Sequence, residues 1–201
     1  MAKLWFRLQE EYDVCRITFF LDTAGATNDA EMFCDVAMTG PSHGKGAGSG
    51  MDMALLQARL AAARGEVPVG AVLLDAHGAV LAQAGNRVEE LQDPSAHAEM
   101  LVMREAVRQR QGRRLADCTL VVSLEPCPMC AAAMAHFRVG RLVFGAYDPK
   151  GGAVEHGARL PYRAETLHRP EIVGGVCERE AAGLLKSFFQ TLRGEGGGPA
   201  G

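Results

Sequence analysis

Residues 94–99 read PSAHAE and residues 126–130 read PCPMC, and the fold must bring these two stretches together. Between them they supply the imidazole of His97, the thiols of Cys127 and Cys130, and the carboxylate of Glu99. One histidine and two cysteines with an open fourth position are typical of a catalytic zinc site rather than a structural one. The alternative is a buried cysteine pair beside an unrelated surface histidine, but two such motifs seldom coincide by chance.

The spacing within each stretch predicts where it lies in a helix. Residues two apart in a helix interior point to nearly opposite sides, so His97 and Glu99 can share a site only at an irregular helix start. Residues 93–95 (DPS) predict that start, with a turn followed by Ser95 as a capping residue. The proline before the first cysteine predicts a second helix with both thiols on one face of its first turn. Two helix N-termini would then favour thiolates at the site.

Apolar patterns alternate between helix and strand after residue 50. The predicted elements are helices at 51–64, 97–110, 127–138 and 177–193, and strands at 67–74, 79–84, 119–124, 141–145 and 171–174. This alternation predicts an α/β sandwich, a central sheet with helices on both faces. Each metal-bearing turn joins the carboxyl end of a strand region to a helix start, where open α/β sheets bind ligands.

The first fifty residues differ from the rest. They lack sustained periodicity, and residues 40–50 form a Gly-rich stretch typical of a flexible linker. We therefore predict two parts, a poorly ordered extension at 1–50 and one domain at 51–201. An alternative is that translation begins at Met51 or Met53 and the extension is a start-site misassignment. Mass spectrometry of the native N-terminus tests this, because an intact peptide from residues 3–16 would rule the misassignment out.

Composition excludes several classes of protein. No apolar run approaches the roughly 18 residues of a membrane span, and residues 17–21 are too short for the apolar core of a signal peptide. We therefore expect a cytoplasmic protein. Basic side chains outnumber acidic ones between residues 100 and 170, so this half could hold a polyanion, although an ordinary solvated surface explains the charge equally well.

The combination of His-x-Glu with Pro-Cys-x-x-Cys is the signature of zinc-dependent base deaminases. From residue 51 to about 193 the chain resembles the bacterial tRNA-specific adenosine deaminases, members of the cytidine deaminase-like superfamily. The matching stretches are 65–72 (GEVPVGAV), 85–87 (GNR), 93–99 (DPSAHAE), 124–130 (LEPCPMC), 143–146 (VFGA) and 188–189 (FF). The resemblance implies a three-layer α/β/α sandwich with a five-stranded mixed sheet, acting as a homodimer with one zinc ion per subunit.

The resemblance also implies an activity and a set of roles. This family converts adenosine to inosine at the wobble position of a tRNA anticodon, so the expected partner is a tRNA anticodon stem-loop. His97, Cys127 and Cys130 would bind Zn²⁺, and its hydroxide would attack C6 of adenine. Glu99 would move the protons, from the water to the purine ring nitrogen and then to the departing amine.

Four further residues are assigned to the substrate by the same resemblance. Asn86 stands where the family hydrogen-bonds the flipped base, although Asn after Gly can simply cap a turn. The backbone of Ala98 is expected to face the base. Asp148 is expected to contact nucleotides beside the target, or else to be an ordinary loop carboxylate. Glu66 is assigned to the pocket, or else is a polar residue at the start of a strand.

The sequence departs from the family where RNA would bind. Tyr147 replaces a usually basic residue, and the last helix ends with one arginine, Arg193, where several basic residues are common. Two alternatives therefore stay open: a deaminase of a free base or nucleoside such as guanine or cytosine, and a non-catalytic deaminase-like subunit that binds RNA. The presence of Glu99 argues against the second alternative.

Overall fold

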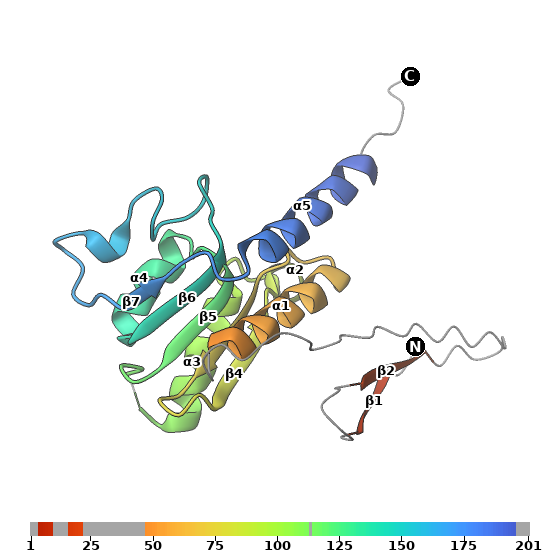
Figure 1. Cartoon of the computed structure of the whole chain (residues 1–201), viewed down its shortest axis with the longest axis horizontal. Helices are drawn as coiled ribbons and strands as arrows, with labels where there is room; N and C mark the ends of the chain where they lie inside the picture. Colours follow the sequence, from red (N-terminus) through yellow and green to blue (C-terminus); the bar gives the residue numbers. More distant parts are fainter. Residues whose placement is uncertain (1–3, 10–15, 22–46, 113, 196–201) are drawn as a thin grey trace. The chain divides into compact units, whose positions relative to one another are not determined.

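A computed structural model describes residues 4–9, 16–21, 47–112 and 114–195 (Figure 1). The chain divides into two units, residues 1–43 and 44–201. In the first unit, β1 (Leu4–Gln9) and β2 (Arg16–Leu21) pair in an antiparallel hairpin. Neither strand was predicted from the sequence. Residues 1–3, 10–15 and 22–46, where the remainder of the predicted extension and most of the linker fall, lie outside the described residues.

The second unit is built on a five-stranded mixed sheet in the order β4-β3-β5-β6-β7. The strands are β3 (Gly70–Leu74), β4 (Val80–Gly85), β5 (Thr119–Leu124), β6 (Arg141–Ala146) and β7 (Glu171–Val173). β3 runs antiparallel to both β4 and β5, while β6 is parallel to β5 and to β7. The carboxyl ends of β4, β5 and β6 therefore lie at the same edge of the sheet.

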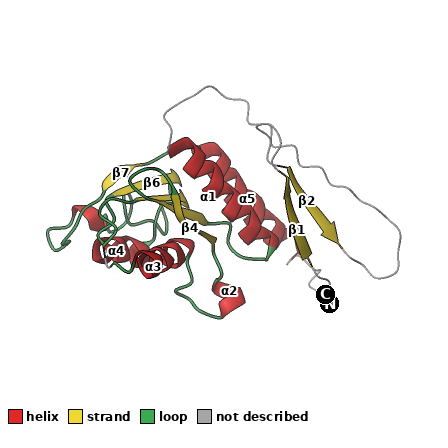
Figure 2. Ribbon diagram, turned by 90° about the horizontal axis from the view of Figure 1, so that it is seen from below, coloured by secondary structure: helices red, strands yellow, loops and turns green. Residues whose placement is uncertain are grey.

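Helices cover both faces of this sheet, as Figure 2 shows. On one face, α1 (Ala47–Ala63) and α5 (Glu178–Glu195) enclose a core that includes Met51, Leu55 and Val121. On the other face, α3 (Ala98–Arg110) and α4 (Pro128–Phe137) enclose a larger core that includes Met103, Leu120 and Phe144. Two short helices lie in the connections, α2 (Val88–Leu91) and η1 (Leu160–Tyr162). The predicted three-layer sandwich with a mixed sheet is confirmed.

Most predicted elements are present with boundaries shifted by a few residues. The largest shift is at α1, which begins at Ala47, inside the stretch assigned to the linker. Met51 and Met53 consequently lie within the helix, and Met51 is completely buried. The strand predicted at 67–74 pairs only from Gly70 onward. Helix α2 was not predicted, since four residues are too few for a periodic pattern. No helix in the described ranges has the length and apolarity needed to cross a membrane.

Close packing of α1 on the sheet requires a glycine at position 70. A Cβ on Gly70 would lie 2.1 Å from the carbonyl oxygen of Ala54 and 2.4 Å from the amide nitrogen of Ala58, both in the backbone of α1. Such contacts are far inside van der Waals distance, so helix and strand can approach this closely only without a side chain. The glycine in the 65–72 stretch therefore sets the spacing between two layers.

Candidate metal centre

His97 lies at the N-cap of α3, in extended backbone with φ −69° and ψ 148°. Its carbonyl oxygen accepts the first hydrogen bond of the helix from the Leu101 amide at 3.0 Å, while its side chain caps nothing. The irregular helix start predicted from the sequence is confirmed. The prediction that Ser95 caps the helix was wrong, because Ser95 donates both its amide and its hydroxyl to Asp93 Oδ1 in the preceding turn.

Cys127 occupies the same position in α4. It is the N-cap residue, with φ −68° and ψ 171°, and Pro128 is the first residue of the helix. The predicted helix therefore starts one residue later than expected, and only Cys130 lies within its first turn. The Cys127 carbonyl accepts a hydrogen bond from the Ala131 amide at 2.9 Å. In both turns, therefore, a predicted metal ligand is the N-cap residue, and its carbonyl accepts the first hydrogen bond of the helix.

The three predicted ligands come together with the geometry of a zinc site. His97 Nδ1 lies 3.7 Å from the Sγ atom of Cys127 and 3.7 Å from that of Cys130, and all three donor atoms lie within 4.8 Å of one another. Tetrahedral zinc with ordinary Zn–N and Zn–S bonds separates nitrogen from sulfur by about 3.6 Å. The donor set therefore fits zinc in both chemistry and spacing. Cys130 is fully buried, whereas the other two ligands are partly exposed.

Electrostatics at the two thiols favour binding of a cation. Hydrogen bonding by Cys130 and His97 outweighs burial and lowers the pKa of Cys127 to about 4. The same hydrogen bond between the thiols, together with burial, raises the pKa of Cys130. The pair therefore favours one thiolate, and a bound metal would displace the second proton.

Glu99, the second residue of α3, is 3% exposed. Its Oε2 atom is buried and accepts no hydrogen bond from any residue that the structure describes. Burial raises the pKa of this carboxyl above its usual range. A buried carboxyl oxygen without a partner costs stability, which marks Glu99 as a candidate functional group beside the metal ligands.

The comparisons with known proteins agree with this site. Residues 47–146 match the family model of the cytidine and deoxycytidylate deaminase zinc-binding region. The chain is 48% identical over 143 residues to the tRNA-specific adenosine deaminase of Agrobacterium fabrum, a match that covers 71% of this chain and 93% of that protein. This chain belongs to the tRNA-specific adenosine deaminases. Its metal centre binds zinc, and the enzyme is a hydrolytic deaminase.

Solved structures place this deaminase in the same fold. One, from a study of A-to-I editing by tRNA:A34 deaminases at the wobble position of transfer RNA, is 47% identical with a TM-score of 0.67, covering 68% of this chain and 99% of that one. A guanine deaminase from Nitrosomonas europaea has a TM-score of 0.62 but is only 22% identical, covering 82% of this chain and 98% of that one. The second likeness establishes the fold alone.

Asn86 and Ala98 are brought to the metal centre by one hydrogen bond. Asn86 follows the end of β4 and is 6% exposed, and its Oδ1 accepts the amide of the fully buried Ala98 at 3.0 Å. This bond orients the Asn86 side chain beside the start of α3, next to His97. The Ala98 amide thus has a partner within the protein. Contact of either residue with a base stays a prediction.

The carboxylate of Glu66 is bonded to the start of α2. Glu66 is 1% exposed, and its two carboxylate oxygens accept the backbone amides of Val88 at 3.0 Å and Glu90 at 2.9 Å. These bonds hold the first turn of α2, which follows Asn86 in the chain. These contacts agree with the alternative of a polar residue at the start of a strand, and the assignment of Glu66 to the pocket stays a prediction.

Asp148 lies on the loop after β6, at the same edge of the sheet as the metal ligands. Its Oδ1 accepts the amides of Lys150 and Gly151, so the carboxylate closes its own turn. Its own amide donates to Glu125 Oε2 at 3.0 Å. The predicted contact with the substrate is not tested by these bonds, but they show that Asp148 is held in a defined position. Glu125, which lies in the quoted 124–130 motif, received no role from the sequence.

Proposed function

We propose that this protein deaminates adenosine to inosine at the wobble position of a tRNA anticodon, with release of ammonia. The observation that carries the proposal is the buried carboxyl of Glu99, whose Oε2 has no partner among the described residues, beside three donors spaced for zinc. Two findings support the choice of substrate: the relative from Agrobacterium fabrum is a tRNA-specific adenosine deaminase, and the solved structure at 47% identity comes from work on tRNA:A34 deaminases.

His97, Cys127 and Cys130 would hold the zinc, which lowers the pKa of a coordinated water and so supplies a nucleophile near neutral pH. Glu99 would take up a proton at its buried carboxyl and deliver it to the purine ring nitrogen. It would then help to protonate the amine that departs from C6 as ammonia. A general acid and base works best when its pKa lies near the working pH, and burial shifts Glu99 in that direction.

Asn86 is proposed to position the base. Its Oδ1 is occupied by the Ala98 amide, so the side-chain NH₂ is the group that can donate to the ring. A donor fixed in this way discriminates between bases by hydrogen bonding, and an analogue without the matching acceptor leaves a buried donor unpaired. Asp148 and Tyr147 are proposed to contact the neighbouring nucleotides, and Tyr147 is 38% exposed, which suits stacking on a base.

We further propose that the protein acts in the cytoplasm as a homodimer, as the family resemblance implies. Sedimentation equilibrium of the purified protein tests the dimer, and a mass equal to one chain across the micromolar range would reject it. Cell fractionation tests the location.

The decisive experiment is to incubate the zinc-loaded protein with an anticodon stem-loop that carries adenosine at the wobble position. Sequencing of the product should show guanosine at that position, as inosine pairs like guanosine, and a stem-loop with guanosine there is the matched control. Parallel reactions with free guanine and free cytosine test the alternative substrates. Ammonia released from a free base alone would overturn the proposed function.

A further inference from the structure

Glu125 has the most heavily hydrogen-bonded carboxylate in the described part of the chain. It is 2% exposed and follows the last residue of β5. Its Oε1 atom accepts the amides of Val154 at 3.1 Å, Glu155 at 2.9 Å and His156 at 2.9 Å. Its Oε2 atom accepts the Asp148 amide at 3.0 Å and lies 2.7 Å from His156 Nδ1. One side chain therefore satisfies four backbone donors and one ring nitrogen.

These bonds join two ends of a single loop. The first donor, Asp148, lies two residues after β6, and the other three lie at the far end of the same segment, residues 154–156. Further bonds close the loop between them, from the Gly152 amide to the Asp148 carbonyl and from the Ala153 amide to the Pro126 carbonyl, both at 2.9 Å. The loop is thus tied to the two residues that precede the zinc ligand Cys127.

The loop packs so closely around this carboxylate that position 152 has no room for a side chain. A Cβ on Gly152 would lie 2.5 Å from the carboxylate carbon of Glu125 and 2.5 Å from the Asp148 carbonyl oxygen. A carboxylate that accepts several backbone amides forms strong hydrogen bonds, so Glu125 holds this part of the loop firmly.

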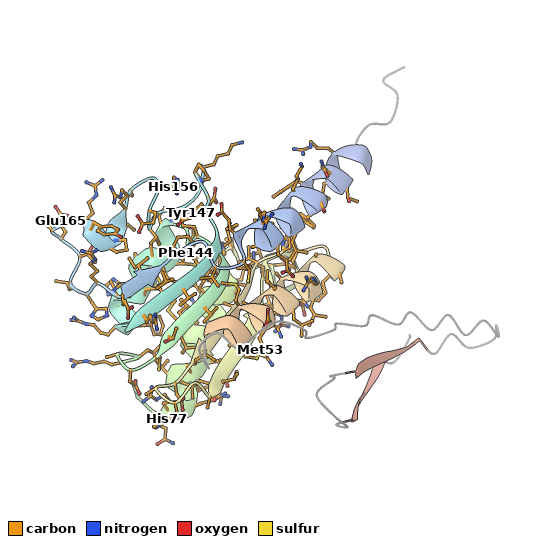
Figure 3. The ribbon with its side chains drawn as sticks, viewed as in Figure 1. Met53, His77, Phe144, Tyr147, His156 and Glu165 are labelled. Atoms are coloured by element: carbon orange, nitrogen blue, oxygen red, sulfur yellow. The ribbon has the colours of Figure 1, made fainter. Side chains whose placement is uncertain are left out.

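Aromatic side chains connect this loop to strand β6. The His156 ring meets the Tyr147 ring edge to face at 5.7 Å, and Tyr147 meets Phe144 of β6 in the same way at 5.1 Å. Figure 3 shows these three labelled rings near the end of β6. The partner of Glu125 therefore packs directly on the tyrosine that replaces a basic residue in this chain.

We propose that Glu125 is a positioning residue that fixes the loop 147–156 to the zinc-ligand turn and so presents Tyr147 and Asp148 to the nucleotides beside the target base. The proposal rests on the proposed function in one respect, that an RNA substrate lies against this loop. The hydrogen bonds that Glu125 accepts come from this loop and not from His97, Cys127 or Cys130. Its effect is on how the loop binds substrate rather than on the chemical step.

Glu125→Gln isolates this role because it changes one atom. A glutamine keeps one oxygen, which can still accept the three amides at residues 154–156. Its NH₂ group then faces the Asp148 amide, so two donors meet and the start of the loop is released. His156→Ala is the second variant, and it removes a half-exposed side chain, so folding is expected to survive. Glu155→Gln is the matched control, since that carboxylate pairs with Tyr162 and Arg159 on the surface of the same loop.

Two readouts separate positioning from a merely structural role. Hydrogen exchange should show the Asp148 amide at least about tenfold less protected in Glu125→Gln, as expected for loss of a bond to a charged group, with zinc stoichiometry unchanged. Steady-state kinetics with the anticodon stem-loop should show KM raised about tenfold or more with kcat within about threefold of wild type. His156→Ala should raise KM by less, and Glu155→Gln should match wild type in both measurements.

Each outcome decides the proposal. Unchanged protection at Asp148, or a fall in kcat with KM unchanged, would overturn it, as would an equal effect of Glu155→Gln. If Glu125→Gln fails to fold, His156→Ala supplies the same two readouts, and wild-type protection and KM in that variant would overturn the proposal. If wild type does not deaminate the stem-loop, the proposed function fails on its own, and the binding constant of the same RNA replaces KM as the test of the loop.

Discussion

Glu99→Gln is the substitution that most directly tests the chemistry of the site. The glutamine has the same size and can occupy the same buried volume, but it cannot accept a proton and return it. His97, Cys127 and Cys130 are unchanged, so the variant should hold zinc as wild type does. Activity should fall while metal content stays at one zinc per chain.

The size of the loss follows from the role. Positioned general acids and bases contribute about 10²–10⁴-fold, which at 1.36 kcal/mol per tenfold corresponds to about 2.7–5.4 kcal/mol of transition-state stabilisation. The stability of the fold should not fall with the activity and is expected to stay equal or increase. Glu99 is 3% exposed, and its Oε2 has no hydrogen-bond partner among the described residues, so a neutral amide removes the cost of burying a charge. We expect a melting temperature equal to or above that of wild type.

The assay pairs single-turnover deamination of the anticodon stem-loop with elemental analysis and thermal unfolding of the same sample. Saturating enzyme removes differences in substrate affinity, so the rate reports the chemical step. A variant with full zinc and a rate within tenfold of wild type would refute the proton-transfer role. Loss of zinc, or a clear drop in melting temperature, would refute the claim that Glu99 is a catalytic group rather than a structural one.

Three further perturbations test the site and the packing around it. Cys127→Ala should lose both zinc and activity by elemental analysis and assay, with the exposed Cys177→Ser as control, and retained stoichiometric zinc would contradict the ligand assignment. Gly70→Ala forces α1 away from the sheet and should lower the free energy of unfolding in urea by about 1–3 kcal/mol. Its control, Gly183→Ala in α5, has nothing within 4 Å and should stabilise by up to about 1 kcal/mol. Hydrogen bonding to Arg110 lowers the pKa of Asp117 from 3.8 to about 2. The pair therefore stabilises the fold above about pH 4 and is lost as the pH falls through about 2, so urea midpoints should drop less across that range in Asp117→Asn than in wild type.

The residues of the metal centre could be predicted from the sequence because they lie in two short motifs with characteristic spacing. His97 and Glu99 are two residues apart, and Cys127 and Cys130 are three apart, so each pair needs only one helix start to be placed. The alternation of strand and helix patterns then puts both starts at one edge of the sheet. No long-range information was needed beyond the order of the elements.

The supporting contacts could not be predicted in the same way. Glu66 and Glu125 each accept backbone amides from segments 22 to 31 residues away, and a backbone donor leaves no trace in the sequence. A glutamate beside a strand has the same appearance whether it binds substrate, holds a loop or faces water. The roles of these two residues appear only when the loops after β4 and β6 are in place.

The early start of α1 has a similar cause. Residues 47–50 (AGSG) have the composition of a linker, yet they form the first turn of the helix. Gly50 is buried, and a Cβ there would lie 3.1 Å from the Val121 side chain and 3.2 Å from that of Leu74. Tertiary packing therefore decides the conformation of a stretch whose intrinsic preference favours a flexible coil.

The two ligands at helix caps limit how this enzyme can be made more heat-resistant. Serine, threonine, aspartate or asparagine at an N-cap is a common way to strengthen a helix, worth about 1 kcal/mol. At α3 and α4 these positions belong to His97 and Cys127, whose side chains cap nothing. A bound zinc ion would join both helix ends through these side chains, so we expect its removal to lower the melting temperature as well as the activity.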